Sequence, residues 1–346
     1  MASRQTGVDS GRFDPLGRSL GQFQRRRFLV FTGALFAQPL AQAQPAASSA
    51  RIGFLVPFTR RGFESRFTAF SSGLREFGYD EGRNLSIEIR SPEGRTQLLP
   101  ALASDLVALK LDVLVTAGTP ATLALKNATT TIPIVTANVG DAVATGLVAS
   151  LARPGGNVTG STFFIQDLYV KRLEMLKEAI PYISQAAVLL DPTNVAIFTN
   201  IKKMEAASQG MSIDLHRFEA KTPDDFEQAF AAMSKKRAQA VTVVEGPMLT
   251  ANVSKTAALA AKYRLPSSGN VEFGDAGGMI GYGVDYLALY HRAAYFVDKI
   301  LKGVKPADLP IEQPTKFELV INAKTASTLE IAVPRIMLLR ADRVIE

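Results

Sequence analysis

The sequence predicts an α/β fold in which two doubly wound parallel-sheet lobes, joined by a multi-strand hinge, enclose a ligand cleft. Short apolar runs alternate with amphipathic stretches along most of the chain, as in βαβ units. The length of 346 residues suits two domains. A break at Arg153-Pro154-Gly155-Gly156, followed by the β-like run Val158–Phe164, separates two such series. We interpret Leu151–Phe164 as the crossover between the lobes.

The first lobe begins with a buried strand and a helix whose apolar residues recur every three or four positions. That stripe consists of Phe63, Phe67, Phe70, Leu74 and Phe77, which we expect in the core. Further on, Thr119 and Pro120 are typical of a helix start. Another helix is expected from Gly140-Asp141 to Leu151. The predicted strands are Arg51–Pro57, Leu85–Arg90, Val113–Thr116 and Ile134–Ala137.

The second lobe repeats the alternation, and its helix start at Thr222-Pro223-Asp224-Asp225 combines a cap, a proline and two acidic residues. Its predicted strands are Ala186–Leu190, Ser212–Phe218, Ala240–Val244 and Leu265–Ser268. We interpret the strand Met279–Tyr282 and the helix Asp285–Leu301 as a return to the first lobe. The expected domains are residues 51–162 with 279–313 for lobe 1, and residues 163–278 with 314–346 for lobe 2. The last predicted strand is Phe317–Ile321, followed by a helix over Asn322–Leu329.

The N-terminus has the three parts of a secretory signal. Arg25-Arg26-Arg27 precedes the apolar run Phe28–Leu40, and Ala41-Gln42-Ala43 matches a small-x-small cleavage site. The apolar run is shorter than the roughly 20 residues that span a bilayer. The arginines also resemble a twin-arginine export motif, so either export route stays open. We therefore expect a signal peptide over residues 1–43, a flexible tether over 44–50, and a periplasmic protein.

Composition excludes several function classes. The chain has no cysteine, which excludes disulfides, thiolate metal sites and a cysteine nucleophile. Six arginines and two aspartates in residues 1–43 account for +4 of the net charge of +7, and the remaining +3 is not typical of nucleic-acid binding. His216 and His291 have no paired metal-ligand spacing. No serine-nucleophile, zinc-protease, P-loop or dinucleotide-binding motif occurs. We expect no enzymatic activity, metal or cofactor.

Candidate ligand-binding residues follow from the rule that ligands bind beyond the carboxyl ends of parallel strands. Asp141 and Glu245 are candidates to pair with an ammonium group, and Thr119 to hydrogen-bond a carboxylate with the helix N-terminus behind it. Phe58 is a candidate to stack on an aromatic ligand. Asp191, Asn194, Asn270 and Tyr282 complete the set. Each also has a structural alternative as a helix cap, a turn residue or sheet cover.

Four stretches of the chain, with the segment after the last of them, resemble a known family. They are Gly140-Asp141 with Gly146-Leu147-Val148, residues 153–160 (RPGGNVTG), residues 277–283 (GGMIGYG) and residues 300–310 (ILKGVKPADLP), continued by residues 313–322 (QPTKFELVIN). They resemble the substrate-binding proteins of ABC transporters, in the tryptophan/tyrosine-binding-protein-like group. The sequence departs from the family pattern at Asp141-Ala142, where members often have Asp-Pro, and at Leu329-Glu330-Ile331, where they often carry a glycine.

The resemblance implies a type I periplasmic binding protein fold. It also implies that the protein delivers a small amino-acid-like or carboxylate ligand, such as an aromatic or branched amino acid, to an inner-membrane ABC permease. We expect a monomer that closes its lobes on the ligand. A ligand-binding sensor domain that feeds a receptor is the main alternative, and an exported enzyme is a weaker one.

Overall fold

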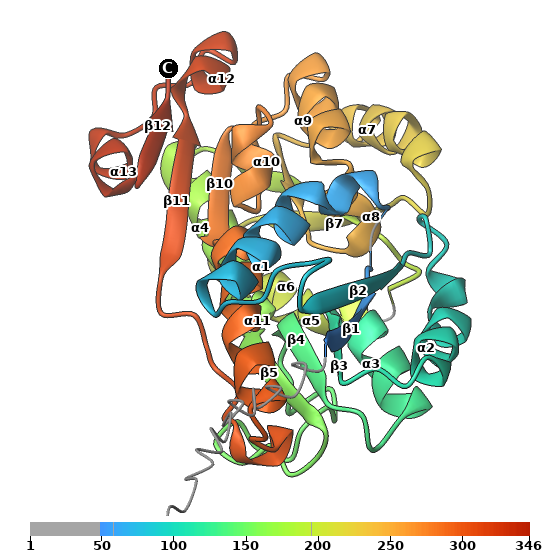
Figure 1. The fold of residues 1–346 in the computed structure, drawn as a ribbon. Coiled ribbons are helices and arrows are strands. Elements are labelled where there is room, and N and C mark those ends of the chain that lie inside the picture. Colours follow the sequence, from blue (N-terminus) through green and yellow to red (C-terminus); the bar gives the residue numbers. More distant parts are fainter. Residues whose placement is uncertain (1–48, 58, 195) are drawn as a thin grey trace, which may run out of the picture. The chain divides into compact units, whose positions relative to one another are not determined.

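The computed structural model describes residues 49–57, 59–194 and 196–346 (Figure 1). The signal peptide predicted over residues 1–43, most of the tether and the candidate residue Phe58 lie outside the described residues. Two sheets organise the described part, and the α/β class predicted from the sequence is confirmed.

The first sheet has five parallel strands in the order β2-β1-β3-β4-β5. They are β1 (Ala50–Leu55), β2 (Leu85–Arg90), β3 (Val113–Thr116), β4 (Ile134–Gly140) and β5 (Val158–Phe163). The covering helices are α1 (Glu64–Glu76), α2 (Leu99–Ala108), α3 (Thr119–Ala128) and, from the last quarter of the chain, α11 (Tyr286–Leu301). Short 3₁₀ turns are η1 (Arg61–Phe63), η2 (Thr96–Leu98), η3 (Pro223–Asp225) and η4 (Pro306–Asp308).

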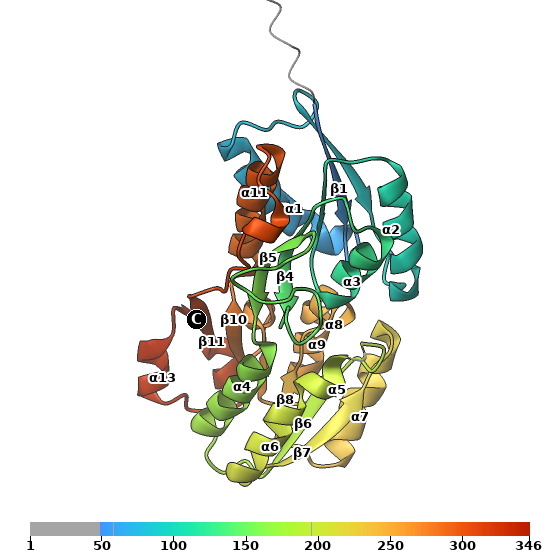
Figure 2. The ribbon, with the colours of Figure 1, turned by 90° about the horizontal axis from the view of Figure 1, so that it is seen from below.

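Adjacent residues of β1 send their side chains to opposite faces of this sheet, because side chains alternate along a strand. Phe54 packs in the cluster of α1 and α11, which also holds Phe70 and Tyr290. Leu55 packs in the cluster of α2 and α3. Figure 2 shows these two helix pairs on the two sides of the strands. The predicted stripe of α1 faces this core, except that its last member, Phe77, is 37% exposed.

The second sheet has seven strands in the order β12-β11-β10-β9-β8-β6-β7, all parallel except the antiparallel pair β10–β11. They are β6 (Gln185–Leu190), β7 (Asp214–Glu219), β8 (Ala240–Val243), β9 (Ser267–Gly269), β10 (Ile280–Val284), β11 (Phe317–Asn322) and β12 (Arg343–Ile345). The accompanying helices are α4 (Ile165–Ala179), α5 (Ala196–Asn200), α6 (Lys202–Gly210), α7 (Phe226–Lys235), α8 (Pro247–Ala251), α9 (Val253–Lys262), α10 (Val271–Asp275), α12 (Ala323–Thr328) and α13 (Arg335–Arg340).

Three segments connect the two sheets. The chain passes from β5 to α4, from β10 back to α11, and from Glu312, whose amide donates to the Gly160 carbonyl of β5, onward to β11. The prediction that the strand Met279–Tyr282 belongs to lobe 1 is wrong. β10 pairs with β9 and β11 in the second sheet, and the return to the first sheet occurs after it, at α11.

The helix predicted from Gly140 to Leu151 does not form, and the segment is a series of turns. Asp141 has φ +26° and Gly146 has φ +69°, which a right-handed helix cannot accommodate. The segment is held by short-range turn bonds, such as that from the Gly146 amide to the Val143 carbonyl at 2.9 Å, and by contacts from outside it. The Thr162 hydroxyl accepts from the amide of Ala142 at 3.0 Å, and the Lys126 ammonium donates to the Gly146 carbonyl. These contacts satisfy backbone groups that helical bonds would otherwise serve.

Candidate functional site

A cleft lies where loops from the carboxyl ends of both sheets meet. It contains about 690 Å³ of space not filled by protein atoms, part of it open to solvent. The lining residues from the first sheet and α1 are Pro57, Arg66, Gly118, Thr119, Pro120, Asn138 and Gly140. Those from the crossing segments are Phe163, Ile165 and Tyr286. The second sheet contributes Asn194, Asn200, Glu245, Gly246, Pro247 and Thr250.

The N-terminus of α3 forms one wall of the cleft. Gly118 precedes the helix at φ +76°, donates its amide to the Asn138 carbonyl at 2.7 Å, and accepts from the Thr122 hydroxyl at 2.8 Å. These bonds fix the loop between β3 and α3. The first amides of a helix lack partners within it and carry partial positive charge, so this end favours an anionic group. Thr119 adds a hydroxyl at the same place.

The opposite wall contains a buried ion pair. Glu245, after β8, receives both terminal nitrogens of Arg172 from α4, one of them at 2.5 Å. The Arg172 side chain is 0% exposed and that of Glu245 is 8% exposed. Arg172 also donates Nε to the Tyr282 carbonyl at 2.8 Å, so β10 helps to hold it. Burial opposes the charge of Arg172, but the Glu245 carboxylate outweighs it and raises the pKa of the guanidinium.

The tyrosine beside this pair is buried as well. Arg172 lies over the ring of Tyr169, with Cζ 5.7 Å from the ring centroid. Burial, followed by the negative charge of Glu245, raises the pKa of Tyr169 well above its ordinary value. Tyr169 is therefore neutral near neutral pH. Of these three residues, Glu245 is the one that lines the cleft.

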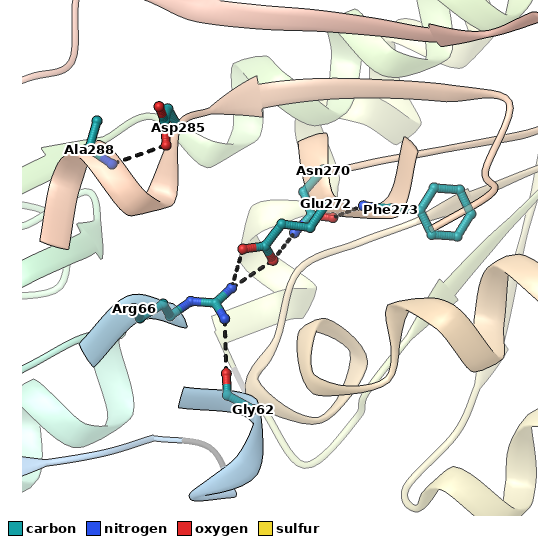
Figure 3. Close-up of polar contacts among 7 residues, drawn as sticks. All are labelled: Gly62, Arg66, Asn270, Glu272, Phe273, Asp285 and Ala288. Carbon is teal, nitrogen blue, oxygen red and sulfur yellow. Dashed lines mark hydrogen bonds and ion pairs between the residues drawn. The ribbon is translucent and has the colours of Figure 1, made fainter. Parts of the chain in front are cut away.

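A second ion pair joins the two sheets (Figure 3). Arg66 of α1 donates one nitrogen to both carboxylate oxygens of Glu272 in α10, at 2.5 and 2.6 Å, and another to the Gly62 carbonyl at 3.0 Å. The Arg66 side chain is 7% exposed and that of Glu272 is 27% exposed. Among the described residues that line the cleft, the charged side chains are Arg66 and Glu245. Each is matched by an opposite charge, so the described part of the lining carries no net charge.

The structure brings three of the predicted site residues, Thr119, Asn194 and Glu245, to the cleft lining. The other described candidates have local partners outside that lining. The Asp141 carboxylate accepts from the Ala144 amide at 3.0 Å, and the Asp191 carboxylate accepts from the Thr193 hydroxyl at 2.7 Å. Asn270 caps α10 by accepting from the Phe273 amide at 3.0 Å. Tyr282 stacks on Phe317 and lines a different surface pocket.

Sequence reasoning did not identify Arg66, Arg172, Asn138, Asn200 or Tyr286. For Arg172 a signal was present. It lies four positions after Leu168 and four before Leu176, on the apolar face of a helix, where a charged residue needs a buried partner. Asn138 directly follows a predicted strand, where the strand-end rule applies, whereas Asn200 and Tyr286 have no comparable pattern around them. Their place in the cleft depends on tertiary structure alone.

Within the described residues, no group of three or more histidine, aspartate or glutamate side chains is arranged to hold a metal ion. In the same part of the chain, no helix combines the length and the apolar character needed to cross a membrane.

Comparisons with known proteins agree with the fold and identify the family. The family model described as "ABC transporter substrate binding protein" matches residues 51–345. A tyrosine-binding protein of Clostridioides difficile is 25% identical over 262 residues, which cover 75% of each chain. A solved conserved domain protein from Vibrio cholerae has a TM-score of 0.79 and 26% identity, covering 86% of this chain and 100% of its own.

A solved ABC domain from Streptococcus pneumonia, in complex with L-Trp, has a TM-score of 0.78 and 24% identity. The match covers 86% of this chain and 100% of that chain. The two structures share the predicted fold, and the family model spans both sheets and every element of the cleft. The chain therefore belongs to the family of ABC transporter substrate-binding proteins.

Proposed function

We propose that the protein is the extracytoplasmic solute-binding component of an ABC importer and that it binds a small zwitterionic amino acid in the cleft. The observation that carries this proposal is the charge balance of the lining: Arg66 and Glu245 are each neutralised by a protein partner. A ligand with net charge would leave that charge uncompensated as the cleft excludes water, whereas a zwitterion adds none.

The two walls offer complementary polar groups for such a ligand. Its carboxylate binds at the N-terminus of α3, with the Thr119 hydroxyl as donor. Its ammonium donates to Glu245, whose carboxylate retains lone pairs beyond the two bonds from Arg172. The side chain of the ligand packs against Phe163, Ile165 and Tyr286, which favours an aromatic or branched amino acid. The tyrosine-binding relative and the L-Trp complex support the same ligand class.

The rest of the proposal concerns context. The protein acts as a monomer, without cofactor or turnover, and passes its ligand to an inner-membrane permease. The predicted signal peptide, cleaved after residue 43, delivers it to the periplasm. Asp141, Asp191, Asn270, Tyr282 and Phe58 remain candidates for contacts made as the lobes move.

Thermal unfolding of the purified protein with a panel of amino acids, aromatic acids and sugars tests this proposal. Ligand at 100 times its dissociation constant adds about 2.7 kcal/mol to the free energy of unfolding, which is a shift of a few degrees. We expect L-tryptophan, L-tyrosine or a branched amino acid to stabilise the protein. Stabilisation by indole-3-acetate and not by L-tryptophan would contradict the zwitterion assignment, because the two share an indole ring but only one carries an ammonium group.

A further inference from the structure

We propose that Glu272 sets the affinity of the cleft without contacting the ligand, as one half of an ion-pair latch that forms when the two lobes close. The inference rests on the proposed binding function and identifies a positioning residue for it. Glu272 is outside the cleft lining, whereas its partner Arg66 is part of that lining. The carboxylate therefore acts on the ligand site through the guanidinium.

The position of this pair in the fold distinguishes it from the other ion pairs. Among the ion pairs of the described residues, Arg66–Glu272 is the one that joins a helix on the first sheet to a helix on the second. The others connect groups within one sheet and its own helices. Rotation about the three crossing segments changes the separation of α1 and α10, so it makes or breaks this pair.

Both partners are held ready for the contact (Figure 3). The Gly62 carbonyl and the ring of Tyr286, with its centroid 5.8 Å from Cζ, fix the Arg66 guanidinium at the cleft. Asn270 caps α10, and its amide nitrogen is 3.4 Å from the Glu272 carboxylate. The Gly62 contact lies within the first lobe and the Asn270 contacts lie within the second, so these bonds are independent of closure. Little side-chain freedom remains to be lost when the latch forms.

The thermodynamic consequence is an affinity contribution that does not depend on the ligand. In the open state, water solvates both charges, and in the closed state they form a partly buried, charge-assisted pair. The apparent dissociation constant of any ligand that requires closure scales inversely with the closed fraction. Losing the latch therefore weakens every ligand by the same factor and leaves the preference between ligands unchanged.

The first test compares Glu272→Gln with wild type, using L-tryptophan and L-tyrosine as probes. We expect the affinity for both to fall by the same factor, about two- to fivefold, as for a partly exposed charge pair. The fall should come from faster dissociation, because the latch forms after the ligand has entered. Raising ionic strength from about 0.05 to about 0.5 M should weaken the wild type more than the variant. Glu318→Gln is the matched control, because Glu318 pairs with Arg343 within the second lobe.

A second test needs no ligand. The chain has no cysteine, so Asp105→Cys in α2 and Lys235→Cys in α7 introduce a single pair of spin labels at exposed positions, one on each lobe. We expect Glu272→Gln to shift the distance distribution of the ligand-free protein away from that of the closed state. If neither probe binds the wild type, the proposed ligand class fails, but this distance measurement still decides the latch.

Two results would overturn the latch. One is a change in the ratio of the two affinities, which would make Glu272 a selectivity residue. The other is an unchanged distance distribution together with unchanged affinities and salt dependence in Glu272→Gln.

Discussion

The two ion pairs at the cleft have the same chemistry but different structural roles. Arg172–Glu245 is almost fully buried and belongs entirely to the second sheet and its helices, whereas Arg66–Glu272 is partly exposed and joins the two sheets. A buried pair within one rigid body cannot separate without exposing a bare charge to the interior, so it fixes geometry. A partly exposed pair between two bodies can separate into water, so it is suited to motion. Location, more than residue type, decides the role.

The largest expected effect comes from removing one half of the buried pair. Arg172→Met leaves the Glu245 carboxylate buried without its partner, which should lower the free energy of unfolding by about 3–5 kcal/mol. Chemical denaturation measures this loss. The double variant Arg172→Met with Glu245→Met should recover much of it. A single variant as stable as wild type would show that the pair is not structurally required.

High pH should lower the free energy of unfolding through Tyr169, the tyrosine beside the buried pair. Burial and the charge of Glu245 raise its pKa in the folded state above the ordinary value of 10, so the unfolded chain releases this proton first. Stability should be unaffected by this group below pH 10 and should fall above it, by up to about 1.4 kcal/mol per pH unit. Tyr169→Phe should remove that part of the alkaline loss in denaturation experiments. Tyr182→Phe, at a tyrosine that is 73% exposed, is the control and should leave the loss in place.

The wall at α3 provides a smaller and more local effect. Thr119→Ala removes one hydroxyl from the cleft lining and should weaken L-tryptophan binding by about 1 kcal/mol, or about fivefold, in isothermal titration. Thr328→Ala is the matched comparison, because its hydroxyl donates to the Lys324 carbonyl within α12, outside that lining. An equal loss in both variants would place the ligand carboxylate elsewhere.

The smallest expected effect is that of Glu272→Gln on the stability of the ligand-free protein. Because more than a quarter of the Glu272 side chain is exposed, its loss should change the free energy of unfolding by less than about 1 kcal/mol. Denaturation of the two single variants, Glu272→Gln and Arg172→Met, should therefore give clearly different losses. Similar losses would remove the distinction between the fixed and the movable pair.

The difference between contacts within one lobe and contacts between lobes also explains what could be predicted from the sequence. Alternating apolar periodicity is a local property, and it predicted the two-sheet fold. The strand-end rule also led to Thr119, Asn194 and Glu245, because the end of a parallel strand is visible in the sequence. The roles of Arg66 and Glu272 depend on a contact between residues 206 positions apart, which no local pattern reports.

The helix predicted after Gly140 shows that a local pattern can also predict the wrong secondary structure. Three of its apolar residues do become buried, as Ala142, Leu147 and Val148 are each less than 10% exposed, although Val143 is 42% exposed. Burial alone does not select a helix, however, and the positive φ angles of Asp141 and Gly146 select turns. The strand predicted near residue 280 exists as β10, but it belongs to the second sheet and not to the first. The sequence does not distinguish the two, because a strand followed by a helix fits either side of a crossing.

The return of α11 to the first sheet has a consequence for the order of folding. The aromatic cluster around Phe54 and Phe70 is completed by Tyr290 and Phe296, which lie in the last fifth of the chain. During synthesis, the N-terminal sheet therefore emerges long before the helix that covers one of its faces. Until α11 is available, these phenylalanines remain exposed. The part of the molecule that is synthesised first therefore completes one face of its core last.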